Sequence, residues 1–471
     1  MTLDSSLELD LAGGDAEIAR TIAVETLHRA TSIYTRSAIV EQLLKDAGWP
    51  GAGGLLCDPS AGDGSFLDTA LKCFLEVRPT ATPDQVLAAV EGWEIHGGAC
   101  REARERLAGI LSAHGWDVGT AAVTAAGMVR HGDFLTEGPR TPRFSVCAGN
   151  PPYLRAENVP GVLREAYDLV VPDHAKSDML HAFLDRCADV VLPDGVVCMV
   201  TSDRWLSNSG AARLREALGR RLKIKHLSRI DGQSAFYRPK TRRAGTPPRV
   251  HPVTVILERS DVPAVAELDG SPIYPGAMVE ESPLGTRTLA DVATVRLSPW
   301  LGTNGIFVVG PEVARTLPEE FLTPVADGRD FTGGLFKGPR KFAIRTEGVE
   351  LPGVIIDHLK REMPRMCARG RRDPWTLPPE NWWGKIDLSR PSLVVPRICK
   401  GLTPIHIPAG VLCINHAVTV HQAAAMSLDQ VDAVLRRAES QRWIEQRAAR
   451  LENGYVSVTT TLLRRLPVPE A

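Results

Sequence analysis

The sequence predicts an α/β fold in which a doubly wound, mostly parallel sheet is followed by a second, mixed α+β domain. Up to about residue 260, short apolar runs alternate with segments of helical spacing, as in a sheet with helices on both faces. A Gly-rich turn joins the first apolar run to a helix. Beyond Ser260 the pattern loosens into short strands between prolines and glycines. A chain of 471 residues is longer than a single hydrophobic core usually supports, so we expect two domains, 1–260 and 261–471.

Apolar periodicity predicts the elements of the first domain in order. Residues 16–48 have helical spacing that breaks around 31–36, so the helical segment 1–50 should hold two helices with an ordered joint. The elements expected next are a strand at 55–57, a helix to Val77, a strand at 90–95, a helix at 100–114, a weak strand before His131, a strand at 144–148, a helix at 178–191, a turn at 192–195, a strand at 196–201, a helix at 211–221, and strands at 224–230 and 253–258.

The second domain is less regular and more basic. A strand is expected at 393–398, and a capping box at Ser427–Gln430 opens a long helix to about Asn453. The net formal charge of the chain is −1, but residues 1–200 hold 16 Lys and Arg against 28 Asp and Glu, and the rest hold 39 against 28. An acidic half joined to a basic half indicates that the basic half faces a polyanion.

The nine cysteines indicate reduced core residues of a cytoplasmic protein, because they form no Cys-x-x-Cys pair and several lie in apolar runs. No membrane partner is expected, since the start of the chain is acidic and no apolar run is long enough to span a bilayer. One group of metal-ligand types has spacings that match no common zinc site, so no metal is expected there: Cys399, His406, Cys413, His416 and His421.

The turn from Asp58 to Leu67 favours an aminated ligand over a phosphate. It lacks Gly-Lys-Ser/Thr, and Leu67 stands where a dinucleotide fingerprint has its third Gly. Asp58 and Asp63 would repel a pyrophosphate and attract an ammonium group.

Further acids close the next strands on the same expected edge. Glu94 is an acceptor suited to two ribose hydroxyls, and Asp133 is an acceptor for an adenine amine beside the flat face of Phe134. A ligand with an amine, a ribose and an adenine but no phosphate is S-adenosylmethionine. The alternative for each acid alone is a solvent-facing loop residue.

The strand at 144–148 stops at Gly149-Asn150-Pro151-Pro152-Tyr153. Asn150 offers a carbonyl acceptor, a proline ring removes a donor so that a main-chain carbonyl can point outward, and Tyr153 offers a flat face. Together they suit a planar ring with an exocyclic amine. Taken alone, the stretch could equally be a proline turn closing a buried strand.

These motifs, in this order, resemble the gamma-class amino-group DNA methyltransferases of the Taq type. The resemblance rests on Tyr34-Thr35, the Gly-rich turn, Glu94, Asp133-Phe134, Asn150 to Tyr153 and the terminal Leu466-Pro467-Val468-Pro469. It is dense up to Arg259 and thin afterwards. It implies a Rossmann-like methyltransferase domain, a target-recognition domain, and N6-adenine methylation of double-stranded DNA in a restriction-modification or phage-defence system.

The resemblance also implies roles for individual residues. Asn150 and the Pro151 carbonyl would accept the two N6 protons, Tyr153 would stack on an adenine flipped out of the duplex, and Asp178 would lie at the base pocket. The cofactor would contact Tyr34, Thr35, Asp58, Pro59, Ser60, Ala61, Gly62, Gly64, Glu94, Ile95, Asp133, Phe134 and Asn150, and the catalytic group would be Asn150, Pro151, Pro152 and Tyr153.

Two departures from the family pattern concern the cofactor and the base. Arg36 replaces the Pro that usually follows the Thr of the first motif, which would bring a cation near the cofactor carboxylate. The second aromatic expected soon after Trp205-Leu206 is missing, and Tyr237 is a candidate substitute.

Basic residues of the second half are candidate DNA contacts, with solvated surface charge as the alternative reading. They are Arg238, Lys240, Arg242, Arg243, Lys337, Arg340, Lys341, Arg371 and Arg372.

We expect a site-specific DNA methyltransferase, with any cutting done by a separate restriction endonuclease or other defence-system subunits. One alternative in the same fold is a protein-glutamine or RNA methyltransferase. Another is a DNA-binding defence subunit with weak or vestigial catalysis.

Overall fold

The computed structural model describes residues 5–51, 53–230, 235–237, 251–259, 263–275, 285–332, 334–346, 350–366, 386–415, 417–422, 425–450 and 454–469. The chain divides into two compact units, Met1–Pro275 and Gly276–Ala471. Residues 263–275 pack on the first unit, since Ala266 bridges to Ile224 and both Leu268 and Ile273 join its core. The division therefore lies beyond residue 260.

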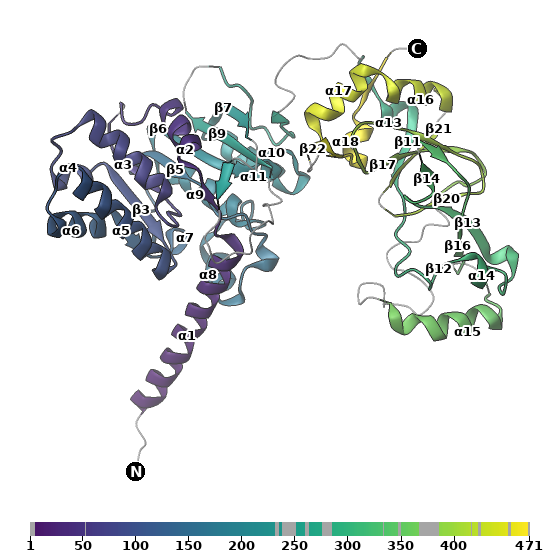
Figure 1. Ribbon diagram of the computed structural model, residues 1–471, viewed down its shortest axis with the longest axis horizontal. Helices are drawn as coiled ribbons and strands as arrows, with labels where there is room; N and C mark the ends of the chain where they lie inside the picture. Colours follow the sequence, from purple (N-terminus) through teal and green to yellow (C-terminus); the bar gives the residue numbers. More distant parts are fainter. Residues whose placement is uncertain are drawn as a thin grey trace. The chain divides into compact units, whose positions relative to one another are not determined.

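A seven-stranded sheet forms the centre of the first unit (Figure 1). Every described pairing among β4, β3, β2, β5 and β6 is parallel, and β9 alone runs against its two neighbours. The predicted doubly wound, mostly parallel sheet is confirmed. In spatial order the strands are β4 (Val129–His131), β3 (Val90–Glu94), β2 (Leu56–Asp58), β5 (Phe144–Gly149), β6 (Val191–Ser202), β9 (Pro252–Glu258) and β7 (Lys223–Arg229).

Helices cover both faces of this sheet because its side chains alternate between two apolar cores. In β5, Val146 and Ala148 join one core and Cys147 joins the other. The first core is closed by α2 (Ser37–Asp46), α3 (Ser65–Val77), α4 (Pro83–Leu87), α5 (Gly97–Ala113) and α6 (Val118–Met128). The second is closed by α1 (Ser5–Thr31), α7 (Phe134–Glu137), α8 (Gly161–Val170), α9 (Met179–Val190), α10 (Arg204–Ser207) and α11 (Ala212–Gly219).

The strands and helices predicted for residues 16–258 are present, with ends that shift by a few residues. The helices α4, α6, α7, α8 and α10 were not predicted. The turn expected at 192–195 lies inside β6, and these residues have no pairing partner in β5. Phe144 of β5 pairs with Val191, and Val146 pairs with Val196.

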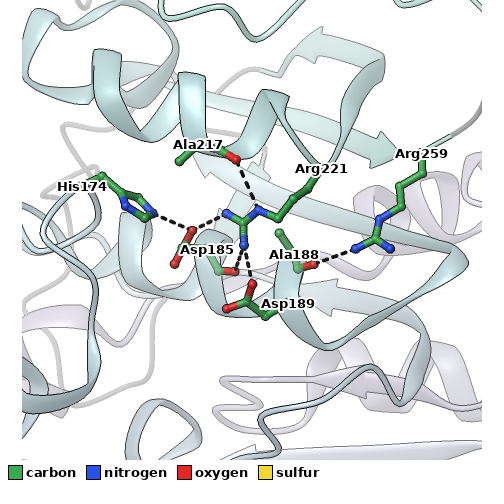
Figure 2. Close-up of polar contacts among 7 residues, drawn as sticks. All are labelled: His174, Asp185, Ala188, Asp189, Ala217, Arg221 and Arg259. Atoms are coloured by element: carbon green, nitrogen blue, oxygen red, sulfur yellow. Dashed lines mark hydrogen bonds and ion pairs between the residues drawn. The ribbon is translucent and has the colours of Figure 1, made fainter.

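An ionic cluster ties α9 to Arg221, which follows α11, and to the segment that precedes α9 (Figure 2). Arg221 donates from one guanidinium nitrogen to Asp189 at 2.5 Å and from the other to Asp185. His174 Nε2 lies 2.9 Å from the same Asp185 oxygen. The Asp185 side chain is 3% exposed, so this contact holds a buried charge between two helices and the segment leading to Asp178.

The second unit is a mixed α+β unit of small sheets. The two four-stranded sheets have the orders β11-β21-β17-β19 and β12-β16-β13-β20. Their strands are β11 (Ala293–Leu297), β12 (Val308–Val309), β13 (Leu322–Ala326), β16 (Lys341–Ile344), β17 (Ser392–Pro396), β19 (Ile405–Ile407), β20 (Leu412–Cys413) and β21 (Ala417–Gln422). The smaller strands are β10 (Arg287–Thr288), β14 (Phe331–Thr332), β15 (Leu335–Phe336), β18 (Ile398–Cys399), β22 (Ala449–Arg450), β23 (Val456–Ser457) and β24 (Pro467–Val468). Helix α15 (Gly353–Glu362) lies between β16 and β17 in the sequence.

The prediction of one long helix from the capping box to about Asn453 is wrong. The capping box does open α16 (Leu428–Arg436), but Arg437 is extended (φ −61°, ψ 145°) and a second helix, α17 (Ala438–Arg447), follows. The Gln441 side chain bonds both the N–H and the carbonyl of Leu402, so contacts outside the helix redirect the chain.

The described cysteines are all free thiols, and all but Cys73 are buried. No three His, Cys, Asp or Glu side chains gather as metal ligands within the described ranges. Among these same residues, no helix is both long and apolar enough to cross a bilayer.

Candidate active site

A pocket lies where β2, β3, β4 and β5 end. Ligand sites in such sheets occur at the carboxyl ends of the strands. It brings together most of the predicted cofactor residues, namely Tyr34, Thr35, Asp58, Pro59, Ser60, Ala61, Gly62, Glu94, Ile95, Asp133, Phe134 and Asn150, with Pro152. The pocket lining does not include Gly64, Pro151 or Tyr153.

The Gly-rich turn requires glycine at two positions. Gly62 has φ +56°, and a Cβ there would lie 2.8 Å from Cε1 of Tyr34. Gly64 has φ +81° and begins α3, where a Cβ would lie 2.9 Å from the Cβ of Ala103. Any side chain would therefore disturb the pocket wall or the packing of α3 on α5.

Glu94 braces this turn from the neighbouring strand. One carboxylate oxygen accepts the Gly62 N–H at 2.8 Å, and the other accepts the His96 N–H at 2.8 Å. Each carboxylate oxygen accepts more than one hydrogen bond, so Glu94 keeps capacity for a ligand hydroxyl.

Asp58 is the most perturbed acid of the pocket. It is buried, and it accepts the Ser60 N–H at 3.0 Å. Burial raises the pKa of Asp58 to about 8, with a further contribution from the charges of Glu94 and Asp63. A cation placed against Asp58 would favour its charged form, so the site suits an ammonium group.

Three buried polar atoms in the pocket have no hydrogen-bond partner among the described residues: Thr35 Oγ1, Ser60 Oγ and Asp133 Oδ2. The other oxygen of Asp133 accepts the Leu135 N–H at 3.0 Å and caps α7. Burial raises the pKa of Asp133, and the nearby Tyr167 hydroxyl opposes this rise by interacting with the carboxylate. A buried polar atom without a partner costs about 1–3 kcal/mol, so such atoms mark places where a ligand can bond. The residues fit a small molecule with amine, hydroxyl and carboxylate groups.

An aromatic wall stands beside Asp133. Phe134 stacks on Phe183 with ring centroids 6.2 Å apart and meets the edge of Trp93 at 6.0 Å. Tyr167 of α8 and Met179 of α9 complete this side of the pocket. Of these, only Phe134 was predicted as a cofactor contact, and the resemblance places Met179 next to Asp178 at the base pocket. The spacing of Met179 and Phe183 on one helix face was the available signal, whereas Tyr167 reaches the pocket through tertiary packing alone.

The end of α1 forms another wall, which was not predicted. Leu27, His28 and Thr31 line the pocket, and His28 stacks on His96 with ring centroids 3.9 Å apart. His96 Nδ1 accepts the Ala99 N–H, so Nε2 carries the proton and donates to Glu25 at 2.9 Å.

Asn150 is held at the pocket by its amide group. Its Nδ2 donates to the Ile33 carbonyl at 2.9 Å, and its Oδ1 accepts the hydroxyl of Tyr153. The same hydroxyl lies 2.9 Å from the Val200 carbonyl. The amide plane is therefore fixed from both ends, between the first motif and β6.

Tyr153 packs partly buried against the core of the first unit. Burial raises the pKa of its hydroxyl well above the usual value, so it stays a proton donor. Asp178 caps α9 by accepting the Leu180 N–H at 3.0 Å, and burial raises its pKa too. It borders a smaller cavity next to Tyr167 and Met179.

Tyr237 lies behind the Gly-rich turn. It belongs to β8 (Phe236–Tyr237), which pairs with β1 (Tyr34–Thr35), and its hydroxyl donates to Asp63 at 2.6 Å. Asp63 also accepts from Arg106 at 2.8 Å. Arg36 is exposed at the start of α2, outside the pocket lining. Trp205 is buried and donates from its indole to Thr201 at 3.0 Å.

Three of the basic candidate DNA contacts are among the described residues, and all three lie in the second unit. Lys337 and Arg340 are exposed, and Arg340 pairs with Asp330 at 2.7 Å. Lys341 pairs with Asp327 at 2.8 Å. The other candidates lie outside the described residues: Arg238, Lys240, Arg242, Arg243, Arg371 and Arg372.

Comparison with known proteins finds similarity to restriction-modification methyltransferases. Residues 126–236 match the family model of the Eco57I restriction-modification methylase. The Type II methyltransferase M.PaeR7I of Pseudomonas aeruginosa is 25% identical over 96% of this chain and 88% of its own length. M.XhoI of Xanthomonas vasicola, also a Type II methyltransferase, is 24% identical over 93% and 90%.

The fold is shared with a solved structure, that of the Type IIL restriction-modification enzyme MmeI in complex with DNA. The TM-score is 0.60 at 12% identity, over 91% of this chain and 64% of the MmeI chain.

Proposed function

Because the chain belongs to the restriction-modification methyltransferases, we propose that it methylates the N6 atom of adenine in double-stranded DNA, as a gamma-class enzyme. The chain is a DNA methyltransferase, and the choice of adenine N6 is our proposal. The observation that carries the proposal is Asn150, an amide fixed by two hydrogen bonds at the wall of the cofactor pocket.

The cofactor is S-adenosylmethionine, which when bound supplies an electrophilic methyl group on sulfur. Asp58 would hold the ammonium group, and the orphaned hydroxyl of Thr35 would bond the carboxylate. Glu94 would accept from the ribose, and the orphaned oxygen of Asp133 would accept the adenine amine beside Phe134.

Adenine N6 needs activation because its lone pair is delocalised into the ring. In the proposed mechanism, Asn150 Oδ1 and the Pro151 carbonyl each accept one N6 proton, which turns the lone pair out of the ring plane. Asn150 Oδ1 has two lone pairs, so it can keep the Tyr153 hydroxyl while it accepts from N6. Positioning and oriented dipoles then supply most of the rate enhancement.

The target adenine has to leave the duplex to reach these acceptors. We assign the ring of Tyr153 to stacking on the flipped base and Asp178 to the rim of its pocket. The basic charge of the second half supports a further assignment: residues 276–471 would recognise the DNA target, and a separate endonuclease would cut unmodified DNA.

One experiment tests the proposal directly. The purified protein is incubated with tritiated cofactor and a mixture of duplex DNA, RNA and protein, and the DNA is digested to nucleosides. We expect label in N6-methyladenine. Label in N4-methylcytosine would contradict the choice of base, and label only in RNA or protein would contradict the substrate.

A further inference from the structure

A short hairpin in the second unit presents an arginine that a buried acid orients toward solvent. It connects β13 to β16, which pair antiparallel, and its own strands β14 and β15 pair Phe331 with Phe336. The two rings are 6.3 Å apart and pack against a buried cluster that includes Val394 and Ile405. Since side chains alternate along a strand, Leu335 faces away from that cluster and is 69% exposed.

Two buried acids organise the base of this hairpin. Asp327 and Asp330 are 8% and 3% exposed. Asp330 accepts the main-chain N–H of Asp327 at 2.9 Å, and Asp327 accepts that of Arg329 at 2.8 Å. Lys341 donates to Asp327 at 2.8 Å and is itself only 26% exposed, so that pair belongs to the interior.

The partner of Asp330 is different, because its cation faces solvent. Arg340 is 62% exposed, and its Nε donates to Asp330 at 2.7 Å. One Nη2 hydrogen goes to the Arg329 carbonyl. A guanidinium has five N–H donors, and these contacts use two of them within the described residues. Both Nη1 hydrogens and one Nη2 hydrogen remain at the outer end of the fork.

That remaining geometry matches one feature of duplex DNA. Guanine presents O6 and N7 as two adjacent acceptors in the major groove, and an arginine fork bonds both. An arginine that is already oriented loses less side-chain entropy on binding, which raises affinity and discrimination. The neighbouring Arg329 and Lys337 flank it and can contact phosphates.

We propose that Arg340, oriented by the buried Asp330, reads a guanine in the target sequence of this enzyme. The inference rests on the proposed DNA methylation, and it deepens it by naming a specificity-determining residue. Arg340 acts on the base directly, and Asp330 is a positioning residue.

The test compares base preference among variants of the full-length protein. A library of random duplex DNA is methylated by the unaltered protein and by Arg340→Ala, Arg340→Lys and Asp330→Asn, and the modified sequences are read. The unaltered protein should require a G·C pair at one position that Arg340→Ala no longer requires, with discrimination there reduced about 10- to 100-fold. Arg340→Lys should relax the same position, and Asp330→Asn should relax it partly.

Two control variants separate base reading from general effects. Lys337→Ala should weaken methylation of all sequences alike, as loss of a phosphate contact does. Arg436 of α16 has the same hydrogen bonds, from Nε to Asp432 and from Nη2 to a carbonyl, but it lies on a helix and Asp432 is less buried than Asp330 and also contacts His406. Arg436→Ala should leave base preference unchanged. Cofactor binding and thermal unfolding show that each variant folds.

The outcomes are distinguishable. Arg340→Ala that lowers methylation of every sequence equally, or keeps the full base preference, overturns the assignment of Arg340 while leaving DNA methylation in place. An unaltered protein that methylates no DNA overturns the proposed function, and the assignment of Arg340 with it.

Discussion

Asn150 is the residue on which the proposed chemistry depends most. Replacing it with Ala removes one of two acceptors for the N6 protons, so we expect the rate of methyl transfer to fall by about 100- to 1000-fold, as for other lost transition-state hydrogen bonds. Cofactor affinity should fall less than about tenfold, because only the bond to the Ile33 carbonyl is lost from that side. Single-turnover kinetics and calorimetric titration measure the two effects. A rate near that of the unaltered protein would exclude Asn150 as an acceptor.

Tyr153 has two separable functions, its hydroxyl and its ring. Tyr153→Phe loses the hydroxyl, whose single hydrogen lies between Asn150 Oδ1 and the Val200 carbonyl, but keeps the stacking face. We therefore expect a lower kcat, by about tenfold, with little change in KM for DNA. Tyr153→Ala should also impair base extrusion. Fluorescence of 2-aminopurine at the target position separates the variants, and equal loss of that signal in both would contradict the division.

Asp58 makes the stability of the protein depend on pH. Burial raises its pKa from 3.8 to about 8, so between these values the folded protein holds a proton that the unfolded chain has lost. The free energy of unfolding therefore falls as pH rises through this window. Asp58→Asn removes the penalty, so without cofactor its Tm relative to the unaltered protein should rise from about pH 5 to about pH 9. A pH-independent difference in Tm would mean that Asp58 is not buried as described.

At the scale of elements, the ion pairs of Arg221 with Asp185 and Asp189 join the end of α11 to α9 (Figure 2). Arg221→Met leaves the buried Asp185 with His174 alone, and we expect a loss of about 2 kcal/mol in unfolding free energy. This is below the usual cost for fully buried pairs, because Arg221 is 23% exposed. Denaturant unfolding measures it. The adjacent Arg220 is 73% exposed in its pair with Glu216, so Arg220→Met should have no measurable effect. Equal losses in both variants would point to a general helix effect.

The order of elements in the first unit could be predicted because its strands are apolar runs that end in acids or an amide. Asp58, Glu94, Asp133 and Asn150 meet at one edge because parallel strands end there together. The helical spacing of Leu163, Tyr167 and Val170 is a signal for α8 that the prediction missed. The spacing does not show that Tyr167 enters the pocket, because that depends on packing against neighbouring helices.

Tertiary contacts explain the remaining errors. The break at Arg437 is not encoded in local helix propensity, since both flanking segments favour helix. It depends on hydrogen bonds from Gln441 to Leu402, which is distant in the sequence. The wall formed by His28 likewise depends on where α1 docks, and its stacking on His96 has no signature in the local sequence.

At the scale of the whole molecule, the acidic first half and the basic second half suit different ligands. The acidic half holds a pocket region with four buried acids, which suits a cationic cofactor and disfavours phosphates: Asp58, Asp63, Glu94 and Asp133. The basic half has 39 Lys and Arg against 28 Asp and Glu. Some of this excess is neutralised internally, as Lys341 shows with Asp327, so fewer cations than the count suggests are available for DNA.

This division predicts a specific dependence on salt. Each phosphate contact releases about 0.9 counterion, so the logarithm of DNA affinity should fall linearly with the logarithm of salt concentration. Lys337→Ala should lower that slope by about 1, whereas Lys341→Ala should leave it nearly unchanged because Lys341 is already paired. Fluorescence anisotropy with a labelled duplex, from about 50 to about 200 mM salt, measures the slopes. Cofactor binding, which involves no phosphate, serves as the control. A shallow slope, or equal effects of the two substitutions, would mean that the basic excess of the second half does not contact the DNA backbone.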